Sequence, residues 1–154
     1  MRLNGREQTE MYSRYKESIR WFGTTVHINE NFSGGRGHFF PRGAVLTVLF
    51  GENVGFEKSG TRPALCISND TNNRNSGNIA VAPLTDKTNK SGKPLFSTQY
   101  VLNQSKYAFL RLDSIVQCED IRVVSKSRIG NVIGFIDASD IRNIEKRLKT
   151  FFAL

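Results

Sequence analysis

The chain has 154 residues, of which 38% are hydrophobic, and it carries a formal net charge of +8. This length suits one globular domain with an appendage, and no apolar run approaches the ~20 residues of a membrane span. The N-terminus lacks the apolar segment of a secretory signal, so we expect a cytoplasmic protein. The basic balance favours a polyanion such as nucleic acid as partner, although a solvated basic face has the same composition.

The N-terminal part is predicted to form a helix over residues 6–22, followed by a stop at Gly23 and an extended segment over 24–32. Its apolar stripe, at spacings of three or four, consists of Met11, Tyr15, Ile19 and Phe22. The stripe either covers one face of the following domain or docks a partner. The Gly-rich residues 33–37 are interpreted as a linker, so residues 1–40 are assigned to a helical extension and linker.

Residues 41–154 are assigned to the main domain, because short apolar runs bounded by Gly, Asn and Pro are typical of β-strands. The predicted strands span residues 45–50, 63–68, 79–84, 98–102 and 107–111, with one or two more within 113–124. Polar loops are expected over 69–78 and 86–94. A terminal helix is predicted over 139–152, capped by Ser139. This order predicts a mainly β fold: a small, strongly bent β-barrel with helices.

Metal and cofactor chemistry is not expected. The only histidines, His27 and His38, precede the strands, and no carboxylate cluster has the spacing of a metal site. Cys66 and Cys118 lie inside apolar runs and are interpreted as buried, unreactive thiols. No bound metal or cofactor is therefore predicted.

The loop between the first two strands carries Glu57, Lys58, Ser59 and Arg62 within six residues. An arginine fork suits a phosphate, and a nearby carboxylate can take a proton from a hydroxyl. With the hydroxyl of Thr85 at the end of the third strand, these groups suit a metal-free attack of an RNA 2′-hydroxyl on its own phosphate. The alternative from the residues alone is that Arg62 is a surface charge and Thr85 an ordinary strand-end residue.

Several ordered motifs resemble the MazF/PemK family of bacterial toxin–antitoxin toxins over about residues 41–152. The matching stretches are RG at 42–43, the G-x-E-x-x-G-x-R-P loop at 55–63, ALCISND at 64–70, VAPLT at 81–85 and DSIVQCEDIRVVSKSRIG at 113–130. The resemblance implies an SH3-like barrel and a homodimer. It also implies an mRNA interferase, which is a metal-independent endoribonuclease that cuts single-stranded RNA at short sequences.

The resemblance assigns the family's loop arginine to Arg62, its strand-end threonine to Thr85 and its loop glutamate to Glu57. Arg62 is expected to stabilise the pentavalent phosphorane, Thr85 to orient the phosphate, and Glu57 to act as the base. The products implied are a 2′,3′-cyclic phosphate and a 5′-hydroxyl. The sequence departs from the family at Phe56, where a Ser or Thr is usual. An aromatic residue there could stack on a base.

RNA is expected to lie in a basic groove at the dimer interface. The candidate RNA-binding residues are Phe56, Lys58, Ser59, Asn69, Arg74, Lys87 and Lys90, with Lys93 and Arg122 as further basic candidates. For these residues the alternatives are a solvated loop charge, a turn-forming Asn69, and an Arg122 paired with Glu119 or Asp120. An acidic antitoxin segment is the expected protein partner. The alternative function is a non-catalytic module on the same barrel that binds nucleic acid or protein.

Overall fold

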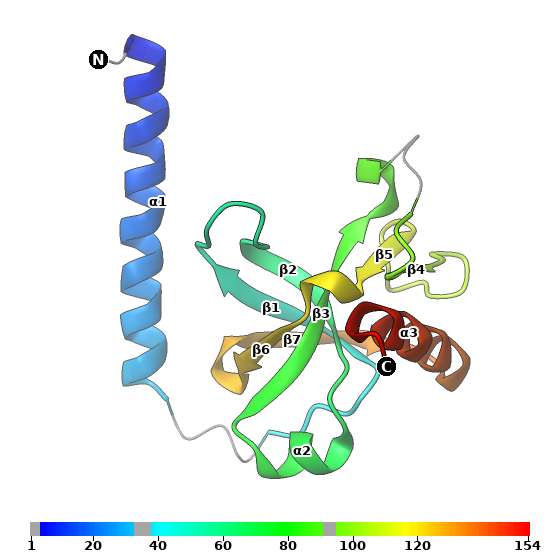
Figure 1. Cartoon of the computed structure of the whole chain (residues 1–154). Coiled ribbons are helices and arrows are strands. Elements are labelled where there is room, and N and C mark those ends of the chain that lie inside the picture. The colour runs from blue at the N-terminus through cyan, green and yellow to red at the C-terminus, as the bar shows by residue number, and fades with distance from the viewer. Residues whose placement is uncertain (1–3, 33–37, 91–94) are drawn as a thin grey trace.

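The computed structural model describes residues 4–32, 38–90 and 95–154, with only the backbone of Asn89 and Lys90 (Figure 1). A long helix α1 (Gly5–Glu30) precedes a β-sheet that ends on a C-terminal helix α3 (Ala138–Phe152). The strands are β1 (Ala44–Gly51), β2 (Gly60–Cys66), β3 (Asn78–Asp86), β4 (Gln99–Leu102), β5 (Ser114–Gln117), β6 (Arg122–Ser125) and β7 (Ile129–Phe135). Short helices α2 (Asp70–Asn75), η1 (Lys87–Lys90), η2 (Cys118–Asp120) and η3 (Lys126–Arg128) connect them.

The seven strands form one strongly bent antiparallel sheet in the order β4-β5-β3-β2-β1-β7, and β6 pairs with β3. The long strand β3 makes this possible. One edge of β3 pairs with β2, whereas the other is divided between β6 over Asn78–Val81 and β5 over Leu84–Asp86. The predicted mainly β fold with helices is confirmed, although no pairing joins β4 to β7 in the described part of the chain.

Strand β1 supplies both halves of the core, which explains its nearly continuous apolar sequence. Successive side chains of a strand point to opposite faces. Val45 therefore packs with Leu65 in one buried cluster, whereas Leu46 and Val48 pack in a second cluster. Helix α3 covers the first cluster through Ile144, which is buried. Because β1 is buried on both faces, its sequence lacks the polar alternation of a surface strand.

The N-terminal end of α3 carries a polar network. Asp137, rather than the predicted Ser139, is the N-cap, because its carboxylate accepts a hydrogen bond from the Asp140 amide at 3.0 Å. The buried carboxylate of Asp140 accepts hydrogen bonds from the Tyr100 and Tyr107 hydroxyls at 2.6 and 2.5 Å. Lys106 Nζ lies 2.6 Å from Asp137 Oδ2 and 2.9 Å from Asp140 Oδ2. The network fixes the start of α3 on β4 and the following turn.

This network predicts a loss of stability in acid. The hydrogen bond from Lys106 holds the pKa of Asp137 well below its ordinary value of about 3.9. A carboxyl whose pKa is lower in the folded than in the unfolded state stabilises the fold above the unfolded pKa, and this stabilisation is lost as pH falls toward the folded pKa. Urea unfolding followed by circular dichroism from pH 7 to pH 2 should therefore show a decline below about pH 4. In Lys106→Met this decline should be shallower, and an equal decline in both proteins would contradict the prediction.

One predicted strand is absent and one observed strand was not predicted. Residues 107–111 form a turn, in which the Leu110 amide donates to the Tyr107 carbonyl, and its apolar side chains pack inward from that turn. Strand β7 was missed, because Gly130 and Gly134 weaken its β pattern. A β-carbon at Gly134 would lie 2.3 Å from Phe109 Cδ1, so this glycine makes room for the ring from the same turn. The polar loop predicted over 69–78 contains the short helix α2.

Helix α1 continues through Gly23 to Glu30, so the predicted stop and the extended segment over 24–32 were wrong. A single glycine costs a long helix only about 1 kcal/mol. The hydroxyls of Thr24 and Thr25 donate to the carbonyls of Arg20 and Trp21, four residues earlier, as side chains in a helix can. The linker predicted at 33–37 lies outside the described residues. No described helix is long and apolar enough to cross a membrane.

Trp21 connects α1 to the hairpin formed by β1 and β2. Gly51 has φ +87°, and a β-carbon there would lie 2.2 Å from Trp21 Cζ2. The guanidinium of Arg128 lies 5.1 Å from the centre of the Trp21 ring, which is cation–π distance. The indole therefore rests directly on the backbone of Gly51.

Replacing Gly51 with alanine should displace α1. The positive φ strains an alanine by about 1–2 kcal/mol, and the new methyl group occupies the place of the indole. Trp21 is the only tryptophan, so the fluorescence of the protein reports whether the indole contacts the hairpin. We expect the emission maximum to shift to the red in Gly51→Ala. Gly55→Ala is the matched control, because Gly55 has φ +61° with nothing within 4 Å of its β-carbon position. A red shift in both variants would mean that strain alone releases the helix.

Candidate active site

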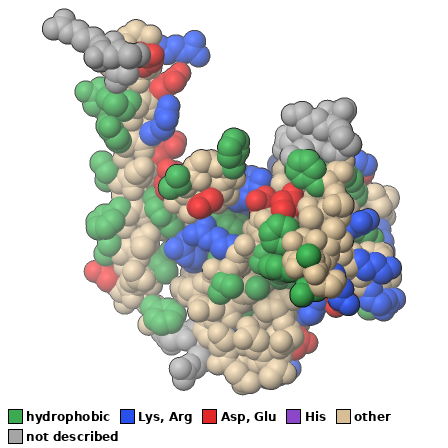
Figure 2. Space-filling view, in the orientation of Figure 1, with side chains coloured by type: hydrophobic (Ala, Val, Ile, Leu, Met, Phe, Trp, Pro, Cys, Tyr) green, Lys and Arg blue, Asp and Glu red, His purple; other side chains and the backbone are tan. Residues whose placement is uncertain are grey.

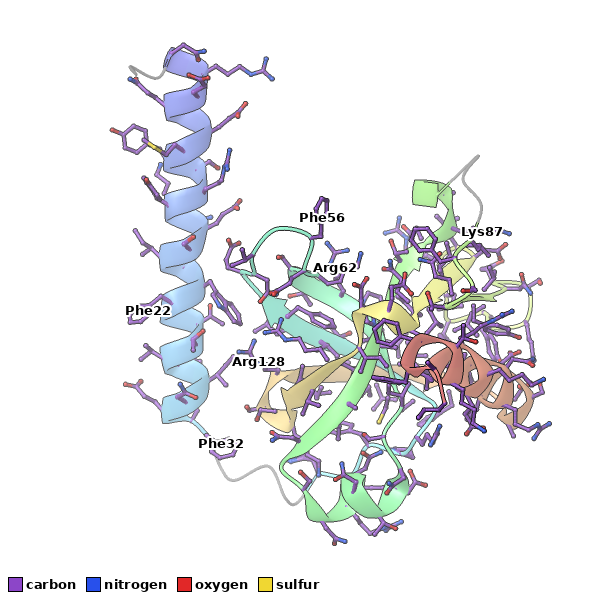
Figure 3. All side chains as sticks on the ribbon, in the orientation of Figure 1. Phe22, Phe32, Phe56, Arg62, Lys87 and Arg128 are labelled. Carbon is purple, nitrogen blue, oxygen red and sulfur yellow. The ribbon has the colours of Figure 1, made fainter. Side chains whose placement is uncertain are left out.

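The β1–β2 loop projects from the sheet and carries Phe56 near its tip (Figure 3). The Phe56 side chain is fully exposed, and Glu57 beside it is also exposed. The loop turns where the Glu57 amide donates to the Val54 carbonyl. An aromatic ring without protein contacts has both faces free to stack on a base.

The base of this loop is held by side chains that donate to one backbone carbonyl. The Phe50 carbonyl accepts hydrogen bonds from Asn53 Nδ2, Arg122 Nη1 and Arg128 Nη1 at 3.3–3.4 Å. Asn53 Nδ2 also donates to the Lys58 carbonyl at 2.6 Å and so joins the two sides of the loop. Arg122 also donates to Asn53 Oδ1 at 2.9 Å, in place of the ion pair considered for it with Glu119 or Asp120.

A shallow pocket of about 360 Å³ lies between the loop and the segment that leads into β6. Its lining residues are Phe50, Glu57, Lys58, Glu119, Asp120, Ile121 and Arg122. Lys58 Nζ is 3.2 Å from Asp120 Oδ2, and the Ser59 hydroxyl donates weakly to the Glu57 carbonyl at 3.5 Å. Basic and acidic side chains accordingly lie side by side below the loop in Figure 2. The candidate Lys58 therefore forms an ion pair with Asp120 across the pocket.

Arg62 lies on β2, below the loop (Figure 3). Its Nε donates to the Ser59 carbonyl at 2.6 Å, which fixes the guanidinium, and its Nη groups have no other protein partner among the described residues. The antiparallel register of β2 and β3 pairs Ala64 with Pro83. Ala64 and Pro83 are the last pair between these strands before β2 runs on along β1 and β3 runs on along β5. Arg62 precedes this pair by two residues and pairs with Val48, whereas Thr85 follows it by two residues and pairs with Ile115.

The other basic candidates lie in different places. Lys87 begins η1 just beyond Thr85, and its Nζ is 3.7 Å from Asp113 Oδ2. The side chain of Lys90 and all of Lys93 lie outside the described residues. Lys87 is therefore the one loop lysine among these that the structure places at the Thr85 end of β3.

The structure does not bring Asn69 and Arg74 to this site. Arg74 lies in α2 and Asn69 is its N-cap, and α2 precedes the first residue of β3. Thr85 stands near the other end of β3, about 23 Å away along an extended strand (Figure 1). The Asn69 side chain caps α2 by accepting from the Asn72 amide at 2.8 Å. The Arg74 guanidinium lies 4.2 Å from the centre of the Phe39 ring. Both have local structural partners.

Burial, and then the nearby Arg122, lower the pKa of Arg128 below its usual value. The backbone carbonyls of Leu49 and Phe50 accept hydrogen bonds from Arg128 and hold it in place.

Among the described residues, no group of three or more His, Cys, Asp or Glu is arranged to hold a metal ion.

Arg128 and Asn53, which position the loop, were not identified from the sequence. Asn53 resembles any polar loop residue in the sequence. Arg128 lies in the stretch SKSRIG, which matched the family but suggested no role for this side chain. Their function depends on the carbonyl of Phe50, and a backbone acceptor leaves no trace in a sequence.

Solved structures with the same fold are MazF proteins and related endoribonucleases. MazF from Deinococcus radiodurans superposes with a TM-score of 0.61 at 20% identity, over 76% of this chain and 99% of that one. An endoribonuclease from a Mycobacterial species, solved with its cognate antitoxin, gives a TM-score of 0.57 at 22% identity over 75% and 96%. At these identities the likeness establishes the fold, a MazF-like barrel.

Residues 41–152 match the family described as PemK-like, MazF-like toxins of type II toxin–antitoxin systems, and the chain belongs to that family. Endoribonuclease EndoA of Bacillus subtilis is 33% identical over 113 residues, which are 73% of this chain and 94% of EndoA. Endoribonuclease MazF of Staphylococcus epidermidis is 33% identical over 70% of this chain and 86% of its own length. The predicted family and the enzyme class, endoribonuclease, are confirmed.

Proposed function

We propose that the protein cleaves single-stranded RNA at short sequences without a metal ion. The 2′-oxygen attacks the adjacent phosphorus, and the bond from phosphorus to the 5′-oxygen breaks. The 2′-hydroxyl proton passes to a base, and the 5′-oxygen gains a proton from an acid. The products are a 2′,3′-cyclic phosphate and a 5′-hydroxyl. The observation that supports the proposal is Arg62 at the base of the exposed loop, with its Nε bound to the Ser59 carbonyl and its Nη groups without a protein partner among the described residues.

Each catalytic residue has a proposed role that follows from its chemistry. Arg62, fixed by the Ser59 carbonyl, would direct its Nη groups at the phosphate and stabilise the charge that develops there. Thr85 would donate its hydroxyl to a phosphate oxygen and orient the group. Glu57, exposed on the loop, would accept the 2′-hydroxyl proton.

The substrate would cross the sheet between the loop and η1. Phe56 would stack on a base, and Ser59, Lys58 and Lys87 would contact the RNA backbone around it. Lys58 must first leave Asp120, so its contribution depends on opening that ion pair. The RNA-binding role predicted for Lys90 remains a proposal. Asn69 and Arg74 would meet only RNA that extends to the far end of β3.

Family membership also supports proposals about the domain boundaries, the oligomeric state and the cellular location of the protein. We assign residues 41–154 to the toxin domain and residues 1–40 to an extension, since the family match covers 41–152. The toxin would act in the cytoplasm as a homodimer. A cognate antitoxin would neutralise it, and the related Mycobacterial endoribonuclease was solved in complex with one.

The decisive experiment incubates the purified protein with a long, mixed-sequence single-stranded RNA in excess EDTA and maps the product ends. The proposal predicts cutting at one short sequence, with cyclic phosphate and 5′-hydroxyl ends. The same RNA annealed to its complement should resist. If folded protein binds RNA without cutting it, the alternative of a non-catalytic binding module replaces this proposal.

A further inference from the structure

The apolar stripe of α1 faces away from the rest of the protein. Tyr15, Ile19 and Phe22 are 55–71% exposed, and Figure 3 shows Phe22 on the side of α1 opposite the sheet. In Figure 2, hydrophobic side chains follow this outer side of α1. The first of the two sequence interpretations, that the stripe covers the domain, is therefore wrong.

The sheet is contacted by the opposite, mostly polar face of α1. Trp21 rests on Gly51, and Glu17, Arg20 and Thr24 line a shared pocket with residues of β1 and β2. Helical residues advance by about 100° each, so these positions lie roughly half a turn from Ile19 and Phe22. An amphipathic helix normally buries its apolar side. Here α1 presents that side to solvent.

The spacing of the exposed residues is that of a helix–helix seam. The large apolar side chains on this face are Tyr12, Tyr15, Ile19, Phe22 and Val26, at alternating spacings of three and four. This is the repeat that lets two helices pack along their length. The stripe spans four turns of a helix about 39 Å long, which begins with a full capping box between Asn4 and Glu7.

Charge identifies the kind of partner. Helix α1 contains four basic and four acidic residues, so it is neutral in a chain whose net charge is +8. A neutral helix does not suit an anionic membrane surface or nucleic acid, which basic faces bind. The positions beside the seam are mostly small and uncharged, as at Ser18, Gly23 and Thr25. Lys16 is the charged residue beside the seam, so two copies of this face bring few like charges together.

We propose that α1 is a self-association surface, which pairs with α1 of a second copy of this chain through the seam. The seam offers on the order of 500 Å² of exposed apolar side chain per copy. Two seams bury on the order of 1,000 Å², which reaches the lower limit of a specific protein interface. This pairing is additional to the homodimer proposed above, and it does not depend on RNA cleavage.

The test is the mass of the particle in solution. The full chain and the double variant Ile19→Glu/Phe22→Glu are compared by sedimentation velocity, and the wild-type mass should be twice that of the variant. Both substituted side chains are exposed, so the helix and sheet should keep their circular dichroism spectrum. Arg14→Glu is the matched control, because it changes the charge by the same amount on the same helix outside the seam, and it should keep the wild-type mass.

A second measurement reports proximity. The native thiols Cys66 and Cys118 are buried, so a cysteine introduced at the seam can be cross-linked selectively with a bifunctional maleimide. Ile19→Cys should give covalent pairs, whereas Arg14→Cys should give few. Equal masses for wild type and the double variant would overturn the proposal. If the double variant instead fails to bind the cognate antitoxin while its own mass is unchanged, the stripe belongs to the antitoxin and self-pairing is likewise overturned.

Discussion

Replacing Arg62 with alanine is expected to reduce kcat for RNA cleavage by about 10²- to 10³-fold, the usual cost of removing one donor to a developing anion. The Arg62 side chain projects from β2 and donates only to the Ser59 carbonyl among the described residues, so the fold should survive. Arg62→Lys should recover little, because an ammonium cannot reproduce the planar fork. Single-turnover cleavage of a defined RNA separates this loss of rate from a loss of binding.

Arg74→Ala is the control for this result. It removes the same charge from α2, at the far end of β3, and should leave the cleavage rate within a factor of about two at fixed salt. If both variants lose binding equally and neither loses rate, Arg62 contributes only to the overall electrostatic attraction of RNA. The proposed catalytic role would then be abandoned.

Replacing Asp140 with alanine is expected to cost about 3 kcal/mol of unfolding free energy, as expected when a buried charged hydrogen-bond partner is lost. Burial alone would raise the pKa of Asp140, but hydrogen bonds from Tyr100, Tyr107 and Lys106 together keep it below its ordinary value. Removing the carboxylate leaves two tyrosine hydroxyls and an ammonium without their shared acceptor. Urea unfolding followed by far-ultraviolet circular dichroism at pH 7 measures the change.

Asp86→Asn provides the comparison for Asp140. Asp86 is exposed at the end of β3, and its substitution should change the unfolding free energy by no more than about 0.5 kcal/mol. If Asp140→Ala falls within the same range, the network does not stabilise α3 and serves another purpose. RNA cleavage at low temperature should survive in Asp140→Ala, because Asp140 lies outside the candidate site.

The sequence predicted correctly those strands and helices whose apolar pattern fits only one kind of secondary structure. The apolar runs of β1, β2 and β3 located these strands, although β2 begins at Gly60, three residues before the prediction. Periodicity found α1 and α3. It failed at residues 107–111, where apolar side chains fill the core from a turn, and at β7, where glycines are required by packing.

The placement of the site was only partly visible in the sequence. The GxRP and APLT motifs indicated Arg62 and Thr85, but the sequence does not show that β2 and β3 stop pairing at Ala64 and Pro83, between these two residues and the rest of the strands. Arg74 was grouped with the site because it occupies a polar loop, and Asn69 because it matches a family position near the substrate. Both lie at the far end of β3 from Thr85. The orientation of α1 was also beyond the sequence, because a helical wheel identifies an apolar face without saying where that face points.

The division of the core into two clusters has a consequence for experiments that follow unfolding. Cys118 lies in the cluster under α3, and Cys66 lies in the other cluster, against β1 and β3. Burial raises the pKa of both thiols, that of Cys118 to about 12. A buried, protonated thiol reacts slowly, so each cysteine should be labelled by a thiol reagent mainly when its half of the core opens. Thiol labelling of the two single-cysteine variants would therefore follow the opening of each half separately.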